Sequence, residues 1–406
     1  MSQRLNFVDV ARSWAIALAL FSHGMLTFGG WRVYGNLPTR TFVRSATPLF
    51  VFMFGMMVEL AYVRRARRNG PASVDGRLLR RSWQCYVGFA VTAVAAVAGG
   101  YYGLGGAFRA SVFLQNAPLG NILRLYAVAL LIAPALVRLR LRSGAPTLLA
   151  LLIALWILDA LLLKPLAGRS FGPLSPWVGI LLGTGSFEVG PSVYHAFTFI
   201  LAGMLAGATL DGWRERGMGA FRAWSGVLLL ACVAVAGTLA LGGLGVRGLF
   251  ESFVEYSRFR ATNHIGYYAV GTGLCVSTLV LLSVVVPKDH MPAWWGAPIE
   301  FGRSSLFSYA AGNTLLVLIP VQLASGLGEV APFLAAGFVL AVLGLANVRR
   351  ALRVRATAAS TVSGSGPSGA GVPTDALRPP PIPEGPSSRS AASPPSSPRS
   401  GGGGAP

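Results

Sequence analysis

Long apolar runs alternate with short polar segments along most of the chain, and these runs predict its structure. Each run has about 18 to 23 residues, enough for a helix to cross a hydrocarbon core of about 30 Å. The runs are continuous rather than alternating, which favours helices over the strands of a β-barrel. We therefore expect an all-α integral membrane protein with its spans in one bundle. The ten predicted spans are centred on residues 8–28, 46–63, 83–102, 118–137, 146–163, 193–210, 223–245, 265–286, 304–321 and 331–347.

The composition agrees with a membrane protein and excludes an ordinary soluble enzyme. Of the 406 residues, 53% are hydrophobic and only 12% are charged, and the mean hydropathy is +0.58. Soluble domains usually carry about 25% charged residues. After Arg355 the composition changes, because Pro, Gly and Ser make up more than half of the remaining residues. Such a segment buries little apolar surface, so we expect a transmembrane domain over residues 1–355 and a disordered cytoplasmic tail over residues 356–406.

Arginines give the chain a large positive charge and predict its orientation. The chain has 34 Lys and Arg against 14 Asp and Glu, a formal net charge of +20. Most of these cations lie in short loops beside predicted spans, which is typical of cytoplasmic loops, and no soluble basic domain is present to bind nucleic acid. We therefore expect both termini to face the cytoplasm. The predicted cytoplasmic loops carry Arg64, Arg65, Arg67, Arg68, Arg77, Arg80, Arg81, Arg138, Arg140, Arg142, Arg214, Arg216, Arg222, Lys288, Arg303, Arg349, Arg350, Arg353 and Arg355.

The first predicted span holds ionisable residues, which are costly in a bilayer and are therefore candidates for function. Asp9 and Arg12 lie near its cytoplasmic end and His23 in its outer half. Eleven residues at 100° each make three turns plus about 20°, so Arg12 and His23 share one helical face about 16 Å apart. Asp9, three residues before Arg12, falls on the same stripe. By contrast, Cys85, Cys232 and Cys275 lie in apolar runs without metal-ligand spacing, so no disulfide framework or metal site is expected.

This stripe suits a reaction between one reactant from each side of a membrane. The imidazole of His23 can take a proton from a hydroxyl near neutral pH, and the guanidinium of Arg12 can hold a phosphate or orient a carboxylate. Acyl-coenzyme A is the obvious long phosphorylated carrier, acting as a co-substrate with no tightly bound cofactor. The alternative is that His23 is an interior hydrogen-bonded histidine and Arg12 an interfacial anchor.

The Arg12 and His23 pair resembles the Arg-x(10)-His signature of the acyltransferase-3 superfamily of membrane acyltransferases. Further stretches are most similar to one branch, the succinyltransferases of osmoregulated periplasmic glucans. Members of this family usually carry a Ser-Gly pair in the second span, where this chain has Phe54 before Gly55. The stretches that carry the resemblance are RLNFVDVARSWAIAL, TPLFVFMFGMMVELAYVRR, RLLRRSWQCYV and FGRSSLFSYAAGNTLL, which cover most of residues 4–103 and roughly 300–320.

The resemblance implies a protein of the bacterial inner membrane that moves acyl groups from acyl-CoA to extracytoplasmic glycans. It implies that His23 is the general base on the acceptor hydroxyl and that Arg12, with Asp9, positions the acyl-CoA or an acidic network. The Arg-x-x-Arg feature of the family matches Arg77 and Arg80. With Arg81 and Arg303, these are the candidates for binding the phosphates of CoA.

A few other polar residues lie where they could contact a glycan acceptor. Tyr194 and His195 begin the sixth predicted span on its outer side, and His264 begins the eighth. An interfacial aromatic belt is the other explanation for this placement. Glu59 near the end of the second span is expected to neutralise one of the loop arginines, and Asp159 to pair with Lys164.

The sequence thus favours an integral membrane O-acyltransferase that transfers an acetyl or succinyl group from cytoplasmic acyl-CoA to a glycan hydroxyl, among surrounding membrane lipid. Two alternatives stay open. One is a transporter or flippase for a lipid-linked or anionic substrate, with Asp9, Arg12 and Glu59 lining its path. The other is a non-catalytic relative that acts as a scaffold through its tail.

Overall fold

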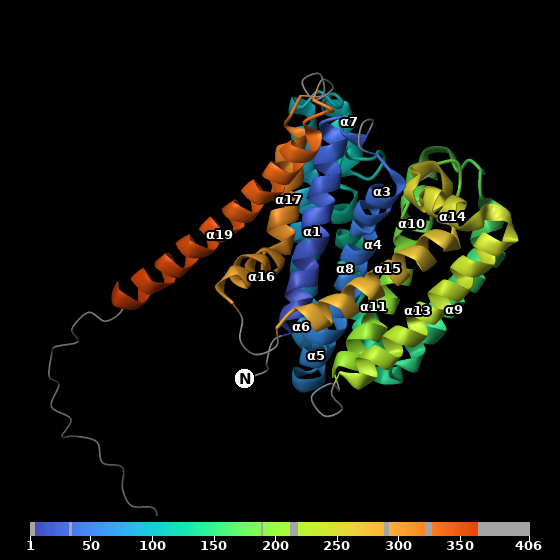
Figure 1. Cartoon of the computed structure of the whole chain (residues 1–406), viewed down its shortest axis with the longest axis horizontal. Coiled ribbons are helices and arrows are strands. Elements are labelled where there is room, and N and C mark those ends of the chain that lie inside the picture. The colour runs from blue at the N-terminus through green and yellow to red at the C-terminus, as the bar shows by residue number, and fades with distance from the viewer. Residues whose placement is uncertain are drawn as a thin grey trace, which may run out of the picture. The chain divides into compact units, whose positions relative to one another are not determined.

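The chain folds into helices that lie side by side (Figure 1). The computed structural model describes residues 5–31, 35–187, 190–211, 218–287, 292–320 and 327–363, and no strand occurs within these ranges. The predicted loop cations Arg214, Arg216 and Lys288 lie outside them. Residues Met1–Arg355 form a compact unit. In Figure 1, α5 lies at the lower end of its helix bundle and α7 at the upper end.

Seven of the described helices are long and apolar enough to cross a membrane. This confirms the all-α class and makes the chain an integral, multi-pass membrane protein. The seven are Leu37–Asn69, Asn121–Ser143, Pro146–Leu166, Val193–Leu210, Gly219–Val254, Ile265–Val285 and Ala331–Leu352. The main helices of these spans are α4 (Ala46–Met57), α8 (Asn121–Ser143), α9 (Pro146–Leu158), α11 (Val193–Asp211), α13 (Gly219–Leu239), α15 (Ile265–Val285) and α19 (Ala331–Ser363).

The other three predicted spans are also helical, but each differs from an ordinary apolar span. Helix α1 (Asn6–Thr27) has 22 residues and α6 (Ala72–Ala98) has 27, so both are long enough, but charged residues in their first halves lower their hydropathy. Helix α17 (Ser305–Val317) has only 13 residues and rises about 20 Å, less than the thickness of a hydrocarbon core. It starts after a break at Ser304 and ends shortly before Pro320, which cannot continue a helix.

Short helices that the apolar pattern does not predict lie between the predicted spans or at their ends. These are α3 (Leu37–Arg44), α5 (Arg64–Asn69), α7 (Leu104–Ser111), α10 (Ser175–Leu182), α14 (Gly245–Val254) and α16 (Gly296–Arg303). Shorter helical turns are η1 (Val58–Val63), η2 (Asp159–Leu163), η3 (Lys164–Leu166), η4 (Gly172–Leu174), η5 (Ala240–Leu244), η6 (Tyr256–Arg260) and η7 (Ala293–Trp295). Several of these turns extend the spans, so the boundaries of the second, fifth and seventh spans lie outside their predicted ranges.

Two glycines let α4 and α11 pack backbone against backbone. A Cβ atom on Gly55 would overlap the carbonyl oxygen of Ile200, and one on Gly203 would overlap that of Phe52. Small residues allow this close approach, which is a main source of helix association in lipid. Gly55 is therefore a packing residue, whatever side chain precedes it.

Helix α1 is surrounded on several sides, which places its polar residues inside the bundle. It packs against α3, α4, α15, α16 and α17. A Cβ atom on Gly302 of α16 would overlap the carbonyl oxygen of Asp9, so the two helices touch through their backbones. In Figure 1, α17 runs beside α1. The residues of α1 that face these neighbours are thus shielded from lipid.

Helix α19 continues to Ser363, eight residues beyond the predicted end of the transmembrane domain. Residues 364–406 lie outside the described part of the chain. The disordered tail therefore stays a prediction.

Candidate functional site

The lower half of α1 carries an ion-pair cluster centred on a buried carboxylate. Asp9 is only 3% exposed, and its two carboxylate oxygens face arginines from two helices. The Nη1 atom of Arg12 lies 3.6 Å from Oδ1, and the Nε atom of Arg303 lies 3.5 Å from Oδ2. Arg12 also donates a hydrogen bond to the hydroxyl of Ser305 at the start of α17. The cluster therefore binds α1 to α16 and α17.

Arg303 joins this cluster and not the other predicted CoA-binding arginines. Besides Asp9, it faces Glu300 one turn earlier on α16, with 3.7 Å between Nη1 and Oε2. It does not line the arginine-rich cavity described below. The proximity of Asp9, Arg12 and Arg303 could not be read from the sequence, because Arg303 lies almost 300 residues from the other two.

The upper half of α1 presents His23 to a buried amide. The Nδ1 atom of His23 lies 2.7 Å from Oδ1 of Asn313, a fully buried residue of α17. The ring of Tyr309 lies 6.2 Å from the imidazole, centroid to centroid, in an edge-on arrangement. Arg12 and His23 thus contact the same neighbouring helix, as their spacing predicts. Because the amide oxygen only accepts, Nδ1 carries the proton and Nε2 keeps its lone pair.

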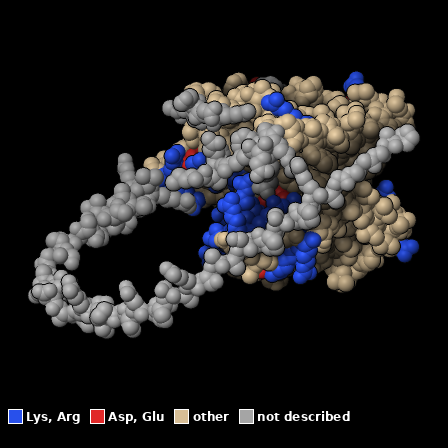
Figure 2. All heavy atoms as spheres, turned by 90° about the horizontal axis from the view of Figure 1, so that it is seen from below, with Lys and Arg blue, Asp and Glu red and all other residues tan. Residues whose placement is uncertain are grey.

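Six arginines line a cavity of about 780 Å³ at the lower end of the bundle. Its walls are η1, α5 and the first turns of α6, and no carboxylate is among its ten lining residues. Figure 2, seen from below, shows a dense group of Lys and Arg on this face. The lining comprises Ala61, Tyr62, Arg64, Arg65, Arg68, Asn69, Arg77, Arg80, Arg81 and Gln84. The predicted CoA-binding residues Arg77, Arg80 and Arg81 therefore lie together, with three further arginines that the sequence assigned to orientation.

A buried ion pair joins η1, which lines this cavity, to α8. Glu59 is 2% exposed and accepts two hydrogen bonds from Arg140 of α8, of 3.1 Å from Nε and 2.8 Å from Nη2. Arg67 lies 3.6 Å from the same carboxylate. The expected pairing of Glu59 with a loop arginine is thus present at Arg67, while Arg140 makes the closer, bidentate contact.

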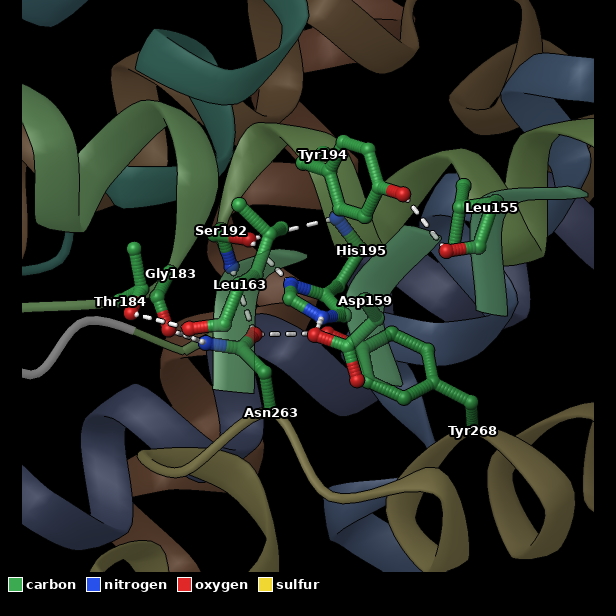
Figure 3. A network of polar contacts seen from close by, with 10 residues as sticks. All are labelled: Leu155, Asp159, Leu163, Gly183, Thr184, Ser192, Tyr194, His195, Asn263 and Tyr268. Atoms are coloured by element: carbon green, nitrogen blue, oxygen red, sulfur yellow. Dashed lines mark hydrogen bonds and ion pairs between the residues drawn. The ribbon is translucent and has the colours of Figure 1, made fainter. Parts of the chain in front are cut away.

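A second polar network lies where α9, α10, α11 and α15 meet (Figure 3). His195 is 1% exposed; its Nε2 atom lies 2.9 Å from Oδ1 of Asp159 and its Nδ1 atom 2.8 Å from the hydroxyl of Ser192. The amide oxygen of Asn263 accepts from the backbone N–H of Ser192 at 3.0 Å and from the hydroxyl of Tyr268 at 2.9 Å. Both ring nitrogens of His195 are thus engaged inside the protein, and Asp159 pairs with His195.

The Ser192, His195 and Asp159 arrangement resembles a hydrolytic triad in composition only. Ser192 is fully buried, and its Oγ also accepts the backbone N–H of His195 in the first turn of α11. A nucleophile needs access to substrate and a base that removes its proton. A buried capping hydroxyl has no such access, so these contacts hold α9, α11 and the turn before α15 together.

The other two predicted acceptor residues lie near this network. Tyr194 is half-buried and donates a hydrogen bond of 2.5 Å to the carbonyl oxygen of Leu155. His264 caps α15 by accepting the N–H of Gly266, and its ring stacks on Phe259 at 4.4 Å. Burial and the charge of Lys164 lower the pKa of His264, so this ring is neutral at neutral pH.

Sequence reasoning did not assign a role to Asn313, although it belongs to a stretch that carries the family resemblance. The only signal was an amide inside an apolar span, which is costly unless it has a partner. Arg44 and Arg260 gave no such signal, because they lie outside the predicted spans, where a charged residue is not costly.

Residues 4–103 match the model of a family described as OpgC protein. No curated protein matches the chain. The matched stretch contains Asp9, Arg12 and His23 of α1 together with all six arginines of the cavity. Asn313, Arg303 and the network around His195 lie outside it. Over these residues the chain is similar to OpgC proteins, as its motifs predict, while the wider acyltransferase-3 resemblance stays a prediction.

Proposed function

We propose that the protein is a membrane O-acyltransferase that moves an acetyl or succinyl group from cytoplasmic acyl-CoA to a hydroxyl of an extracytoplasmic glycan. The observation that carries this proposal is the state of His23. A histidine inside the bundle, with Nδ1–H held by an amide oxygen, keeps Nε2 as a base on the same helix as an arginine cluster. The similarity of residues 4–103 to OpgC proteins supports the same chemistry.

In the proposed reaction, Nε2 of His23 takes the proton of the acceptor hydroxyl as its oxygen attacks the thioester carbonyl. The new C–O bond forms and the C–S bond breaks, and the proton on His23 passes to the leaving thiolate. The products are an acylated glycan and CoA with a free thiol. Asn313 keeps the ring in one orientation and one tautomer. In catalytic triads, the residue that hydrogen-bonds to the catalytic histidine has the same role.

The arginine-lined cavity is the proposed place for the phosphates of CoA. Guanidinium groups bind phosphate oxygens through charge-assisted and often bidentate hydrogen bonds. The cavity offers six such groups without a competing carboxylate among its lining residues. The pantetheine arm would then extend along α1 toward His23, and Arg12 would lie on its way.

The test is acyl transfer by the full chain in lipid nanodiscs, followed as CoA release and as mass increase of a glucan acceptor. We expect His23→Gln to lower turnover by at least about 100-fold, since general-base catalysis contributes about 10²–10⁴-fold. Ser22→Ala, one residue earlier on α1, is the matched control and should keep wild-type turnover. Near-normal turnover of His23→Gln would refute the proposed base. If the wild type bound no acyl-CoA and released no CoA, the transporter alternative would replace the enzyme.

A further inference from the structure

A second pair of arginines does not line the cavity and belongs to elements of the upper half, since α3 and α14, which η6 contacts, lie there in Figure 1. Arg44 ends α3, and Arg260 ends η6. Helix α3 contacts α1 and α14, and η6 contacts α14 and α15, so both arginines lie among helices that pack around α1. Both side chains are half-buried. Neither takes part in an ion pair among the residues that the structure describes.

Both charges lie within electrostatic range of His23. Arg44 and Arg260 also lie within such range of each other and of Tyr267. Arg260 is held in place by a 3.0 Å hydrogen bond from its Nε to the carbonyl oxygen of Gly190, and its guanidinium lies 5.4 Å from the centre of the Tyr256 ring. Two cations at half-buried positions repel each other unless an anion lies between or beside them.

Two buried donors in the same region have no hydrogen-bond partner. The hydroxyl of Tyr267, a residue 1% exposed, is one of them, and Nδ2 of Asn313, in the same amide that faces His23, is the other. Buried polar atoms are almost always paired, so an unpaired hydroxyl within range of two arginines, with an unpaired amide N–H beside His23, offers what an anion needs. Carboxylates accept several such hydrogen bonds at once.

We propose that Arg44, Arg260, Tyr267 and Asn313 form an anion subsite beside His23 that binds a carboxylate carried by one of the two reactants. This inference rests on the proposed function and adds a specificity site to it. The carboxylate has two possible sources. It belongs either to the far end of a dicarboxylic acyl group on CoA or to the acceptor.

The network of Figure 3 holds this subsite in place. Asn263, three residues after Arg260, has a left-handed backbone (φ 50°) and binds the N-terminus of α11 through Ser192. His195 and Asp159 fix Ser192 in turn. The segment that contains Gly190, the acceptor of the Arg260 hydrogen bond, is therefore tied to the turn that contains Arg260. His195 and Asp159 are positioning residues for the subsite in this arrangement, and they do not contact a reactant.

The experiment compares reactants that differ only in the carboxylate. Binding and transfer of succinyl-CoA and acetyl-CoA are measured with the full chain in nanodiscs, with wild type, Arg260→Gln, Arg44→Gln and Tyr267→Phe. If the donor carries the carboxylate, each variant weakens binding of succinyl-CoA by at least about tenfold and leaves acetyl-CoA unchanged. If the acceptor carries it, the loss appears only with a carboxylate-bearing glucan, with either donor.

Arg258→Gln is the matched control, since Arg258 belongs to the same turn η6 but is exposed and paired with Glu255. The shape-conserving Tyr267→Phe keeps the test meaningful if an arginine variant fails to fold. Equal losses for charged and neutral reactants, or no loss in any variant, would overturn the subsite. A wild type that binds acyl-CoA with discrimination but transfers nothing would instead refute the proposed function and leave the subsite standing.

Discussion

At the scale of single residues, the partner of His23 is a neutral amide rather than a carboxylate. An amide oxygen fixes the ring and its tautomer, but it stabilises the protonated imidazolium less than a negative charge does. If His23 is the proposed base, a neutral partner lets the ring give up its proton readily, which suits a reaction whose leaving thiolate needs that proton.

Glu59 offers a stability prediction at the same scale. Its carboxylate is buried and bound by both Nε and Nη2 of Arg140. Glu59→Gln leaves the guanidinium buried without its counter-charge, which costs about 3–5 kcal/mol for a buried pair. We expect a clearly lower thermal unfolding temperature in detergent. The control is Asp75→Asn, which removes the carboxylate of the more exposed pair with Arg138 and should cost no more than about 1 kcal/mol. Equal unfolding temperatures for the two variants would contradict this prediction.

At the scale of elements, the lengths of the apolar runs predict the helices better than their ends. All ten apolar runs are helical, because a run of apolar residues in lipid has no other way to satisfy its backbone. The apolar pattern does not predict the short helices α7 and α10. Each has only eight residues, too few turns for the helical period of apolar residues to be recognised. The ninth predicted span, 304–321, is longer than α17, because hydropathy alone does not register Pro320, shortly before which the helix ends.

In the candidate site, too, the sequence predicts local relations but not contacts between distant helices. The shared face of Arg12 and His23 is local and needed only the helical period. The partners Asn313, Ser305 and Arg303 come from helices almost 300 residues away, and no local pattern contains that contact. The sequence singled out His23 and Arg12 as candidates, and the fold shows which side chains from distant helices contact them.

The contact between α1 and α16 yields a prediction for this scale. Gly302 has no room for a side chain because a Cβ atom there would overlap the carbonyl oxygen of Asp9. Gly302→Ala must push the two helices apart, which we expect to cost about 1–3 kcal/mol and to loosen the Asp9 cluster. Thermal unfolding and turnover should both fall. Gly296→Ala is the matched control on the same helix, where the added methyl group meets open space and stability should be unchanged. An unaffected Gly302→Ala would mean that α16 does not pack as described.

The cavity between α5 and α6 yields a second prediction at this scale, which concerns CoA binding. If the cavity holds CoA phosphates, Arg77→Ala and Arg80→Ala should each weaken CoA binding about tenfold, and binding should weaken further as ionic strength rises. Calorimetric titration of the nanodisc-embedded chain with CoA measures both effects. Arg142→Ala removes an exposed arginine of α8 that does not line the cavity, and it should bind CoA like the wild type. If all three variants bound CoA as tightly as the wild type, the cavity arginines would serve only to orient the protein in the membrane.

At the scale of the whole molecule, the arginine cavity and the upper end around α7 should lie on opposite sides of the membrane. The density of arginines in α5 and early α6 predicts that the lower end faces the cytoplasm, where CoA is made. His23 and the subsite around Arg260 lie toward the other end, where a glycan would arrive. The proposed chemistry requires this separation, since a thioester and an acceptor from the same side would need no enzyme that spans the bilayer.

Thiol labelling of intact cells decides this orientation. The native Cys85, Cys232 and Cys275 are all buried and should react slowly with a membrane-impermeant maleimide. Cysteines placed at Gly76, in the first part of α6, and at Gly105, in α7, have open space around them and should react freely wherever the reagent reaches. We expect Gly105→Cys to be labelled in intact cells and Gly76→Cys only after the membrane is broken. The reverse pattern would leave the cavity facing away from cytoplasmic CoA, and the acyl donor would then have to be sought on the outer side.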